Sequence, residues 1–392
     1  MSKRTVIIGG GIGGLAAALS CFRAGADVEL LDRAADFSQF GAGVQLGPNV
    51  TKVLHGWDLG HALEGLASFP DRLQVRSALT GAELGVLPLG TATRQRYGSP
   101  YATIHRTDLH FILLSALKQQ TDVSPQFNSE LRRFEQTDNG VSVETTDGRQ
   151  RSADVLVGAD GLWSTVRAQL LGDGQPLATG HLAYRALVAQ SSLPAQLRSQ
   201  QVTVWLGPRM HMVHYPARRG ELLNVVAIVE GHMTGDPRYW NHSANAAKLR
   251  SLLAATCTPV QELVHAIADW RLWALNSRPP MRGPTQHAQG RVALLGDAAH
   301  PMLPYLAQGA GMAIEDAQAL SQALAPDNAD VAATLQNYAR RRWQRNARVQ
   351  AGALRNGRIF HATGMLCWGR DAAMKVLGER LLVMPWLYRG PT

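Results

Sequence analysis

The chain opens with alternating strand-like and helix-like apolar patterns. Thr5–Gly9 is an apolar run of strand length, Gly13–Arg23 has helical apolar spacing, and Val28–Asp32 is a second strand-like run. Gly25 stands where a helix would end in a left-handed residue. This order predicts a parallel β-α-β unit at the start of the chain.

The pattern changes in the middle of the chain. From about residue 180 to 229, segments rich in Val, Leu, Tyr and Trp alternate with turns such as 217–221, which is typical of an antiparallel sheet covering a pocket. After Arg291 a buried strand returns, and helices follow it. We therefore expect an α/β fold. Residues 1–175 and 285–392 form one discontinuous nucleotide-binding domain with C-terminal helices. Residues 176–284 form an inserted, mainly antiparallel β domain, which a short piece near 70–100 joins.

Composition narrows the class of protein. The 392 residues, 45% of them hydrophobic and 18% charged, suit a globular protein with two cores. The three cysteines are far apart and form no C-x-x-C pair, which argues against a metal centre or disulfides and suits a reducing cytoplasm. Five glycines between Gly9 and Gly14 would break a secretory signal, and no apolar run is long enough to cross a bilayer. We expect a soluble, cytoplasmic protein.

The formal net charge is +9, and much of it comes from a basic run at 338–358. This run predicts a long helix with a solvated basic face. An alternative is a positive field that attracts an anionic substrate and a pyridine nucleotide. The sequence shows neither stacking platforms nor a known module for nucleic acids, so we expect no nucleic-acid partner.

The first chemical motif is Gly9-x-Gly11-x-x-Gly14, between the first strand and the first helix. Glycines there permit a tight turn, close approach of a pyrophosphate, and packing of helix on strand. The helix N-terminus presents amide groups to negative charge. Asp32, at the end of the second strand, can accept the ribose hydroxyls. The motif predicts dinucleotide binding and leaves FAD and NAD both open.

The second motif, Val292–Ala317, distinguishes between FAD and NAD. It runs from a strand through Gly296-Asp297 and a loop to a helix that starts near Gly309. A carboxylate at a strand end can hold a ribityl hydroxyl, and the helix start aims N–H groups at the pyrimidine edge of a flavin. A plain NAD dehydrogenase has no use for this element, so the motif indicates FAD.

The third motif is Asp160-Gly161 within Asp154–Arg167, after a buried strand. One interpretation is a simple strand-to-helix turn in which Asp160 caps the helix and Gly161 takes a positive φ. The other is a functional site.

Together these motifs resemble a known family. GGGIGG at 9–14, GADG-x-x-S-x-V-R at 158–167 and GDAAH at 296–300 resemble the class A flavoprotein monooxygenases, the p-hydroxybenzoate hydroxylase-like family. Gly41–Asn49, His105–Leu109, His211–Pro216 and Pro385–Tyr388 are similar to its salicylate and 3-hydroxybenzoate hydroxylase branch.

The resemblance implies a fold and an activity. The fold is a glutathione-reductase-like FAD-binding Rossmann domain with non-covalent FAD. The activity is insertion of one oxygen atom of O2 into an aromatic hydroxy acid such as salicylate, through a C4a-hydroperoxyflavin, with NADH or NADPH as transient reductant. Members often form homodimers, and the chain carries no independent signal for one.

The resemblance also implies roles for residues around FAD. Asp32 with Arg33 meets the adenosine ribose, and Arg106 reaches the phosphate–ribityl stretch. Gln45 lies near the flavin. Three glycines cradle the pyrophosphate: Gly9, Gly11 and Gly14. Leu131 lies by the adenine or else in the core, Asp160 serves FAD and passing NAD(P)H, and Asp297 holds the ribityl chain. The flavin ring is bordered by Pro304, Gly309, Ala310, Gly311 and Met312.

The chain departs from the family pattern at three places. Asp32 stands where the family usually carries Glu, and Ser277-Arg278 where it tends to carry Asp-Arg, so one ion pair is in doubt. Pro304 replaces a polar residue of the 3-hydroxybenzoate branch, which counts against that substrate.

Hydroxylation of a phenol requires that its proton be removed. His211, His214 and Tyr215 fall on one expected strand, where His211 and Tyr215 share a face and His214 points the other way. Our candidate catalytic residues are therefore His211, Tyr215 and Pro304, with a purely structural histidine–tyrosine pair as the alternative. We expect His300 to pack and hydrogen-bond in the flavin loop. Tyr184-Arg185 either assists a carboxylate or lies on the sheet surface.

Rival functions differ in their sequence signals. The Trp-x-Trp-x-Ile-Pro run of flavin halogenases is absent, and the complete Gly-Asp motif argues against a non-enzymatic escort protein. A flavin reductase or oxidase that does not hydroxylate stays open, as do 3-hydroxybenzoate and 6-hydroxynicotinate as alternative substrates.

Overall fold

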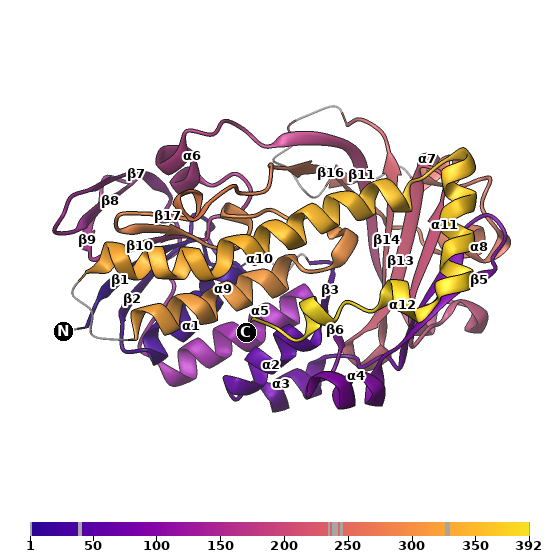
Figure 1. Ribbon diagram of the computed structural model, residues 1–392, viewed down its shortest axis with the longest axis horizontal. Coiled ribbons are helices and arrows are strands. Elements are labelled where there is room, and N and C mark those ends of the chain that lie inside the picture. The colour runs from indigo at the N-terminus through magenta and orange to yellow at the C-terminus, as the bar shows by residue number, and fades with distance from the viewer. Residues whose placement is uncertain are drawn as a thin grey trace.

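The protein consists of two β-sheet regions joined by a long helix (Figure 1). The computed structural model describes residues 2–37, 41–233, 236, 242–243, 246–325 and 330–391. A five-stranded sheet lies on the left of Figure 1 and an eight-stranded sheet on the right, and α10 (Val331–Phe360) spans the front from one to the other.

The five-stranded sheet has the order β17-β18-β10-β1-β2, and all its neighbouring strands are parallel except β17 and β18. The expected β-α-β opening is confirmed, with α1 (Ile12–Arg23) between β1 and β2. The strand ends at Ile8, one residue earlier than expected, because Gly9 takes φ +105°. The strands are β1 (Arg4–Ile8), β2 (Asp27–Leu31), β10 (Val155–Gly158), β17 (Ala288–Gln289) and β18 (Val292–Leu294).

Helix α1 packs against α5 and α9 on one side of this sheet. Ala16, Ala17 and Ala18 of α1 are fully buried, so their small side chains allow close contact between helices. The Ser20 hydroxyl donates to the carbonyl of Ala317 in α9, which ties the first helix to a helix almost 300 residues later in the sequence. The other helices of this half are α2 (Pro48–Gly56), α3 (Gly60–Leu66), α5 (Arg106–Gln120), α6 (Thr165–Leu171) and α9 (Gly309–Leu324).

The eight-stranded sheet has the order β15-β16-β11-β14-β13-β12-β4-β5. Its pairs are antiparallel except β4 with β12, so the antiparallel sheet expected at 180–229 is present. Strands β4 and β5 come from the stretch near 70–100 that was expected to join this sheet. The strands are β4 (Arg72–Ser77), β5 (Glu83–Pro88), β11 (Leu177–Ala189), β12 (Val202–Gly207), β13 (Met210–Ala217), β14 (Leu222–Glu230), β15 (His242–Ser243) and β16 (Arg271–Ser277).

Helices cover both faces of the eight-stranded sheet. One face packs against α7 (Ala246–Leu252) and α8 (Thr258–Ala266). The C-terminal helices α11 (Gly364–Leu377) and α12 (Glu379–Leu382) pack against β5, at the far right of Figure 1. The C-terminal helices therefore contact the second sheet as well as the first half. Two short helices complete the set, α4 (Gly90–Tyr97) and α13 (Pro385–Tyr388).

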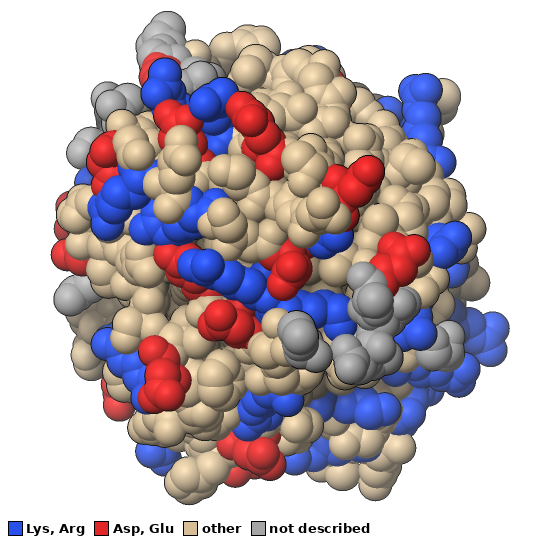
Figure 2. All heavy atoms as spheres, turned by 90° about the vertical axis from the view of Figure 1, so that its left-hand side faces the viewer, with Lys and Arg blue, Asp and Glu red and all other residues tan. Residues whose placement is uncertain are grey.

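Two small sheets flank the first half: β3 (Gly43–Leu46) with β6 (Ala102–His105), and β7 (Leu131–Gln136), β8 (Val141–Thr145) and β9 (Gln150–Ala153). On the face at the left of Figure 1, basic side chains lie among acidic ones (Figure 2). Arg133 of β7, for example, pairs with Glu144 of β8 at 2.7 Å. This face therefore carries charged side chains of both signs.

The basic run forms part of α10, as expected, but some of its charged side chains are exposed and others are buried. Arg340 and Arg341 are exposed, whereas Arg342 is only 1% exposed. The expectation of a solvated face is therefore wrong for Arg342, whose charge has partners inside the protein. Among the helices that the structure describes, we find none with both the length and the apolar character needed to span a bilayer.

Candidate active site

The turn between β1 and α1 has the geometry that the glycine motif requires. A Cβ on Gly9 would lie 2.4 Å from the Ala159 carbonyl oxygen, and one on Gly14 would lie 1.7 Å from the Gly9 carbonyl oxygen, so neither position accepts a side chain. Gly11 differs, because a Cβ there would have Arg106 Nη2 as its nearest described neighbour, at 4.0 Å. It faces an open cleft of about 660 Å³ that Asp32 and Arg106 also line.

Asp32 anchors this turn from the end of β2. Its carboxylate accepts hydrogen bonds from the Gly10 amide at 2.5 Å and the Ala34 amide at 2.8 Å. Arg33 is exposed and does not line the cleft, so the structure does not bring it together with Asp32. Of the two expected adenosine contacts, only Asp32 is positioned in the cleft.

The second motif packs against the first: a Cβ on Gly13 would lie 2.8 Å from Leu295 Cδ2 and 3.3 Å from the Ala313 Cβ. Gly296 lies in the loop after β18 with φ +59°, and Asp297 is the next residue. Asp297 is exposed, yet desolvation by the surrounding protein raises the pKa of its carboxyl, which the charges of His300 and Arg106 partly oppose. A Cβ on Gly309, at the start of α9, would lie 3.9 Å from Asp297 Oδ1. Segments almost 300 residues apart in the sequence thus share one site.

A buried network of charged side chains ties α9 to the loop that contains Gly296 and His300. The Arg342 guanidinium donates to Asp316 at 2.7 Å and to Glu315 at 2.8 Å. Asp316 also bonds with His300 at 2.5 Å and accepts from the Gly296 amide at 3.2 Å. Burial alone would raise the pKa of Asp316, but the charges of His300 and Arg342 lower it. His300 therefore has the hydrogen-bonding place expected for it in the loop.

The third motif has the hydrogen bonds expected of a strand-to-helix turn. The Asp160 carboxylate accepts from the Ser164 hydroxyl at 2.5 Å and from the Thr165 amide at 2.7 Å, and Gly161 takes φ +78°. These bonds hold the start of α6. Leu131 is 4% exposed and packs in a core cluster with Ile8, in line with its alternative role as a core residue.

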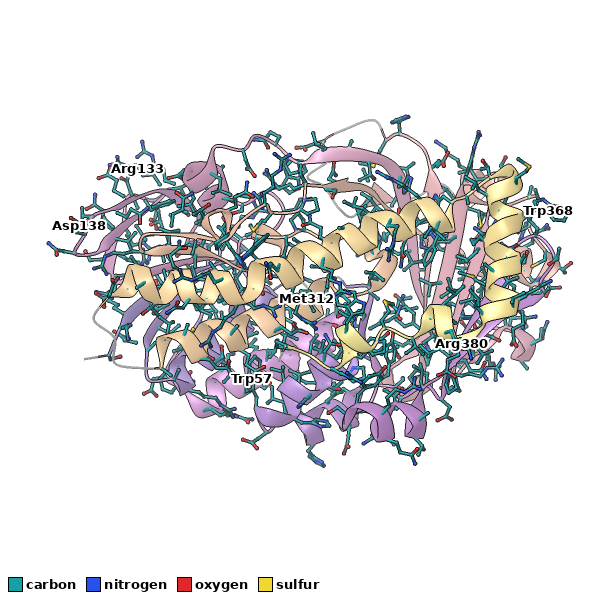
Figure 3. All side chains as sticks on the ribbon, in the orientation of Figure 1. Trp57, Arg133, Asp138, Met312, Trp368 and Arg380 are labelled. Atoms are coloured by element: carbon teal, nitrogen blue, oxygen red, sulfur yellow. The ribbon has the colours of Figure 1, made fainter. Side chains whose placement is uncertain are left out.

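A second, larger cavity of about 770 Å³ lies between the eight-stranded sheet and the C-terminal helices. Its walls are mostly apolar side chains of the sheet and of α10–α12. Gln45 of β3 and Pro304 lie on its wall, and Met312 of α9 packs nearby with Tyr215, near the centre of the molecule in Figure 3. Tyr101 and Tyr388 add hydroxyl groups to the wall. Tyr388 ends the Pro385–Tyr388 segment that carries part of the family resemblance, whereas Tyr101 had no signal in the sequence.

His211 and Tyr215 lie on β13 as expected, but only His211 lines this cavity, and Tyr215 is buried in a core cluster with Met312. His211 lines the cavity, and its Nδ1 hydrogen-bonds with His361 Nε2 at 2.8 Å. Burial lowers the pKa of His211 well below its usual value, and it raises that of Tyr215, partly opposed by a hydrogen bond with Gln45. His214 points to the opposite face and packs near Trp205.

The Tyr184–Arg185 pair splits between the faces of the sheet. Tyr184 is 1% exposed and belongs to the core beneath α7 and α8. Arg185 is 8% exposed, and its guanidinium lies over the Trp273 ring at 4.6 Å. Arg185 is therefore not a sheet-surface charge, and its burial lowers its pKa to about 10.

Comparison with known proteins agrees with this geometry. A family model described as "FAD binding domain" matches residues 3–353. The chain is 38% identical over 386 residues to a 3-hydroxybenzoate 6-hydroxylase of Polaromonas naphthalenivorans (strain CJ2), covering 98% of this chain and 95% of the relative. It is 36% identical to a 6-hydroxynicotinate 3-monooxygenase of Bordetella bronchiseptica, over 96% of this chain and 97% of the relative.

Solved structures show the same fold. A salicylate hydroxylase in complex with substrate superposes with a TM-score of 0.83 at 27% identity, covering 99% of this chain and 95% of that chain. Klebsiella pneumoniae HpxO with FAD and uric acid gives 0.85 at 26% identity, over 97% and 94% of the two chains. The fold, the FAD cleft and the relatives agree, and the chain belongs to the FAD binding domain family as an FAD-dependent class A flavin monooxygenase that hydroxylates aromatic compounds.

Proposed function

We propose that the protein is an NAD(P)H-consuming monooxygenase of a monocyclic aromatic hydroxy acid, with 3-hydroxybenzoate as the first substrate to test. The sequence favoured salicylate, but three relatives at 36–38% identity are named 3-hydroxybenzoate 6-hydroxylases, which favours the alternative. Pro304 at the cavity wall remains the feature that counts against this substrate.

One observation carries the proposal. His211 stands on the wall of a mostly apolar cavity, and no described residue hydrogen-bonds its Nε2. A neutral imidazole has one nitrogen with a free lone pair, so a phenol in this cavity can give its hydroxyl proton to that nitrogen. Burial lowers the pKa of His211, which weakens the imidazole as a base. Loss of the proton makes the ring a better nucleophile.

The residues of the cleft fit FAD. The open space at Gly11 admits a pyrophosphate, Asp32 would hold the ribose, and Arg106 and Asp297 would hold the phosphate–ribityl stretch, with the start of α9 along the ring. When bound, FAD supplies the redox chemistry that activates oxygen. The mostly apolar walls would keep water from the phenol, and Gln45 on the wall would orient it. Tyr215 does not line the cavity and acts by hydrogen-bonding with Gln45. The chain has one G-x-G-x-x-G motif, so NADH or NADPH would bind only transiently.

A substrate panel tests the proposal. The purified flavoprotein would be given NADH or NADPH with 3-hydroxybenzoate, salicylate or 6-hydroxynicotinate under labelled oxygen gas. We expect one acid to stimulate reductant consumption and to gain one labelled oxygen atom. If every acid yields only hydrogen peroxide, the protein is a flavin reductase or oxidase, and the proposal is wrong.

A further inference from the structure

The turn between β13 and β14 holds two arginines in a backbone conformation that residues with a side chain rarely adopt. Arg218 has φ +48° and Arg219 has φ +56°, and Gly220 follows them with φ +89°. Glycine or asparagine occupies this left-handed region with less strain, so the arginines weaken the turn. Because strain of this kind persists where side chains have a use, we examine what the two arginines contact.

Only one of the two arginines has a partner inside the protein. Arg218 Nε and Nη2 donate to the Asp108 carboxylate of α5 at 2.9 and 2.8 Å. This hydrogen bond raises the pKa of Arg218 most, and the charge of Glu221 also raises it. Arg219 is exposed, and no described residue forms a hydrogen bond or an ion pair with it. The carboxylates near this turn therefore act on Arg218, and the charge of Arg219 is free to meet a ligand.

The turn borders the FAD cleft next to an exposed aromatic ring. Arg218 and Phe111 line the cleft together with Arg106. Both also reach solvent, since the Arg218 side chain is 45% exposed and Phe111 is 61% exposed. Phe111 follows Asp108 by one turn of α5, so these two side chains are neighbours and the ring lies near the Arg218 guanidinium. The outer edge of the cleft thus combines a phenyl ring with cationic side chains.

A phenyl ring beside a free guanidinium matches the chemistry of a nucleotide. The face of a phenyl ring stacks on adenine, and a guanidinium binds phosphate oxygens through charge-assisted hydrogen bonds. The reductant of the proposed reaction carries both groups, and it has to approach the flavin while FAD fills the cleft. A surface at the edge of the cleft can hold this second dinucleotide beside FAD without displacing it.

We propose that Phe111 and Arg219 bind NAD(P)H during flavin reduction, with the adenine on the Phe111 ring and phosphate oxygens on the Arg219 guanidinium. The inference rests on the proposed function, in which NAD(P)H is the reductant. Arg218 is a positioning residue, because its two bonds to Asp108 hold the turn against α5 at the edge of the cleft. Both binding groups are exposed to water, so binding is weak, which suits a reductant that leaves after each turnover.

The test uses the full-length, FAD-loaded protein, so that the adenine site of FAD is filled. Isothermal titration with ADP-ribose and with 2′-phospho-ADP-ribose measures binding of the nucleotide part without any redox reaction. Stopped-flow absorbance of the flavin then measures its reduction by NADH and by NADPH. The variants are Arg219→Gln, Arg219→Lys, Arg219→Gly and Phe111→Ala.

Arg209→Gly is the matched control. Arg209 is also an arginine with φ +56°, in the turn before β13, at the other end of the strand. Its side chain is 73% exposed, and it does not line the FAD cleft. The control therefore changes the same kind of residue in the same backbone conformation, away from the proposed surface.

We expect Arg219→Gln and Phe111→Ala each to raise the dissociation constant of 2′-phospho-ADP-ribose by about 5-fold, because each loses one solvent-exposed contact. The FAD content should stay that of the wild type, and Arg219→Lys should keep most of the affinity. An equal loss for ADP-ribose assigns Arg219 to the diphosphate, and a loss for the phosphorylated ligand alone assigns it to the 2′-phosphate. Flavin reduction should need a correspondingly higher NAD(P)H concentration.

Stability gives a signature that a structural arginine would not show. Arg219→Gly relieves the strained backbone, so it should be at least as stable to denaturant as the wild type and yet bind as weakly as Arg219→Gln. Arg209→Gly should relieve its own turn in the same way and keep the wild-type affinity.

The outcomes separate this inference from the proposed function. If neither NADH nor NADPH reduces the flavin of the wild type, the proposed reductant is wrong and the inference fails with it. If the wild type is reduced normally while Arg219→Gln and Phe111→Ala bind both ligands as the wild type does, the function stands and the nucleotide surface is overturned. Loss of FAD from either variant would assign the surface to the FAD site instead and would also overturn the inference.

Discussion

The cofactor cleft and the substrate cavity are built in opposite ways. In the cleft, Gly9, Gly11 and Gly14 lie within six residues, and their backbone shapes the site with Asp32 close by in the sequence. The cavity takes its walls from β3, β13 and the helices after residue 331, and side chains shape it. The cleft therefore depends on backbone conformation and accepts no side chain at Gly9 or Gly14, whereas the cavity can change single side chains without losing the fold.

The difference also separates two kinds of chemistry. The cleft offers amides and opposite charges to a cofactor with phosphates and hydroxyls, so its affinity is spread over many contacts. The cavity is apolar, with few polar groups, so one nitrogen on His211 can decide the rate. Variants in the cleft should change FAD content, and variants in the cavity should change catalysis at constant FAD.

The largest effect is expected for Gly14→Ala in the cleft. The new Cβ would stand 1.7 Å from the Gly9 carbonyl oxygen, which is backbone and cannot move aside. We expect a loss of at least about 3 kcal/mol in the free energy of unfolding and no bound flavin. Gly65→Ala in α3 is the control, because nothing lies within 4 Å of its Cβ. Denaturant unfolding and the flavin absorbance measure both effects. A yellow, stable Gly14→Ala protein would show that the turn is less constrained than its geometry indicates.

The next effect belongs to the cavity. His211→Gln should slow hydroxylation by about 10²–10⁴-fold and raise uncoupled peroxide, because the phenol loses its base. Tyr215→Phe should have a smaller effect, since the Tyr215 hydroxyl acts on the phenol only through its hydrogen bond with Gln45. Flavin content should equal that of the wild type in both, measured by absorbance after denaturation. Normal hydroxylation and coupling in both variants would make the pair structural.

A smaller effect is expected for Asp297→Ala, in the loop after β18. A lost hydrogen bond to a charged group costs about 1.5–3 kcal/mol, which weakens FAD binding roughly 10- to 150-fold. Isothermal titration of the apoprotein with FAD measures it. Asp160→Ala is a useful comparison: its carboxylate bonds within its own loop, so its loss should lower stability rather than FAD affinity. Unchanged FAD affinity in Asp297→Ala would remove the ribityl role.

These contrasts explain what the sequence could and could not predict. The β-α-β turn, Asp32 and the Gly-Asp loop follow from local spacing, and the shared face of His211 and Tyr215 follows from the period of a strand. The contacts of His361 and of the cavity tyrosine Tyr101 had no local signal, because segments more than 100 residues apart bring them together. Glu315-Asp316 is an acidic pair inside a largely apolar stretch of helix. Because buried charges need partners, this pair was a usable sequence signal for a buried ionic network.

The smallest effect is expected for Arg33→Ala, and it tests the boundary of the cleft most directly. Arg33 follows Asp32 in the sequence, but it is exposed and outside the cleft lining. Charges on exposed side chains contribute little because water and salt screen them, so FAD affinity should change by less than about 2-fold. Asp32→Ala removes both the ribose acceptor and two backbone hydrogen bonds, and it should weaken binding by more than about 10-fold in the same titration. If Arg33→Ala loses as much affinity as Asp32→Ala, the arginine must move into the cleft when FAD binds, and the cleft would then be less preformed than the glycine turn suggests.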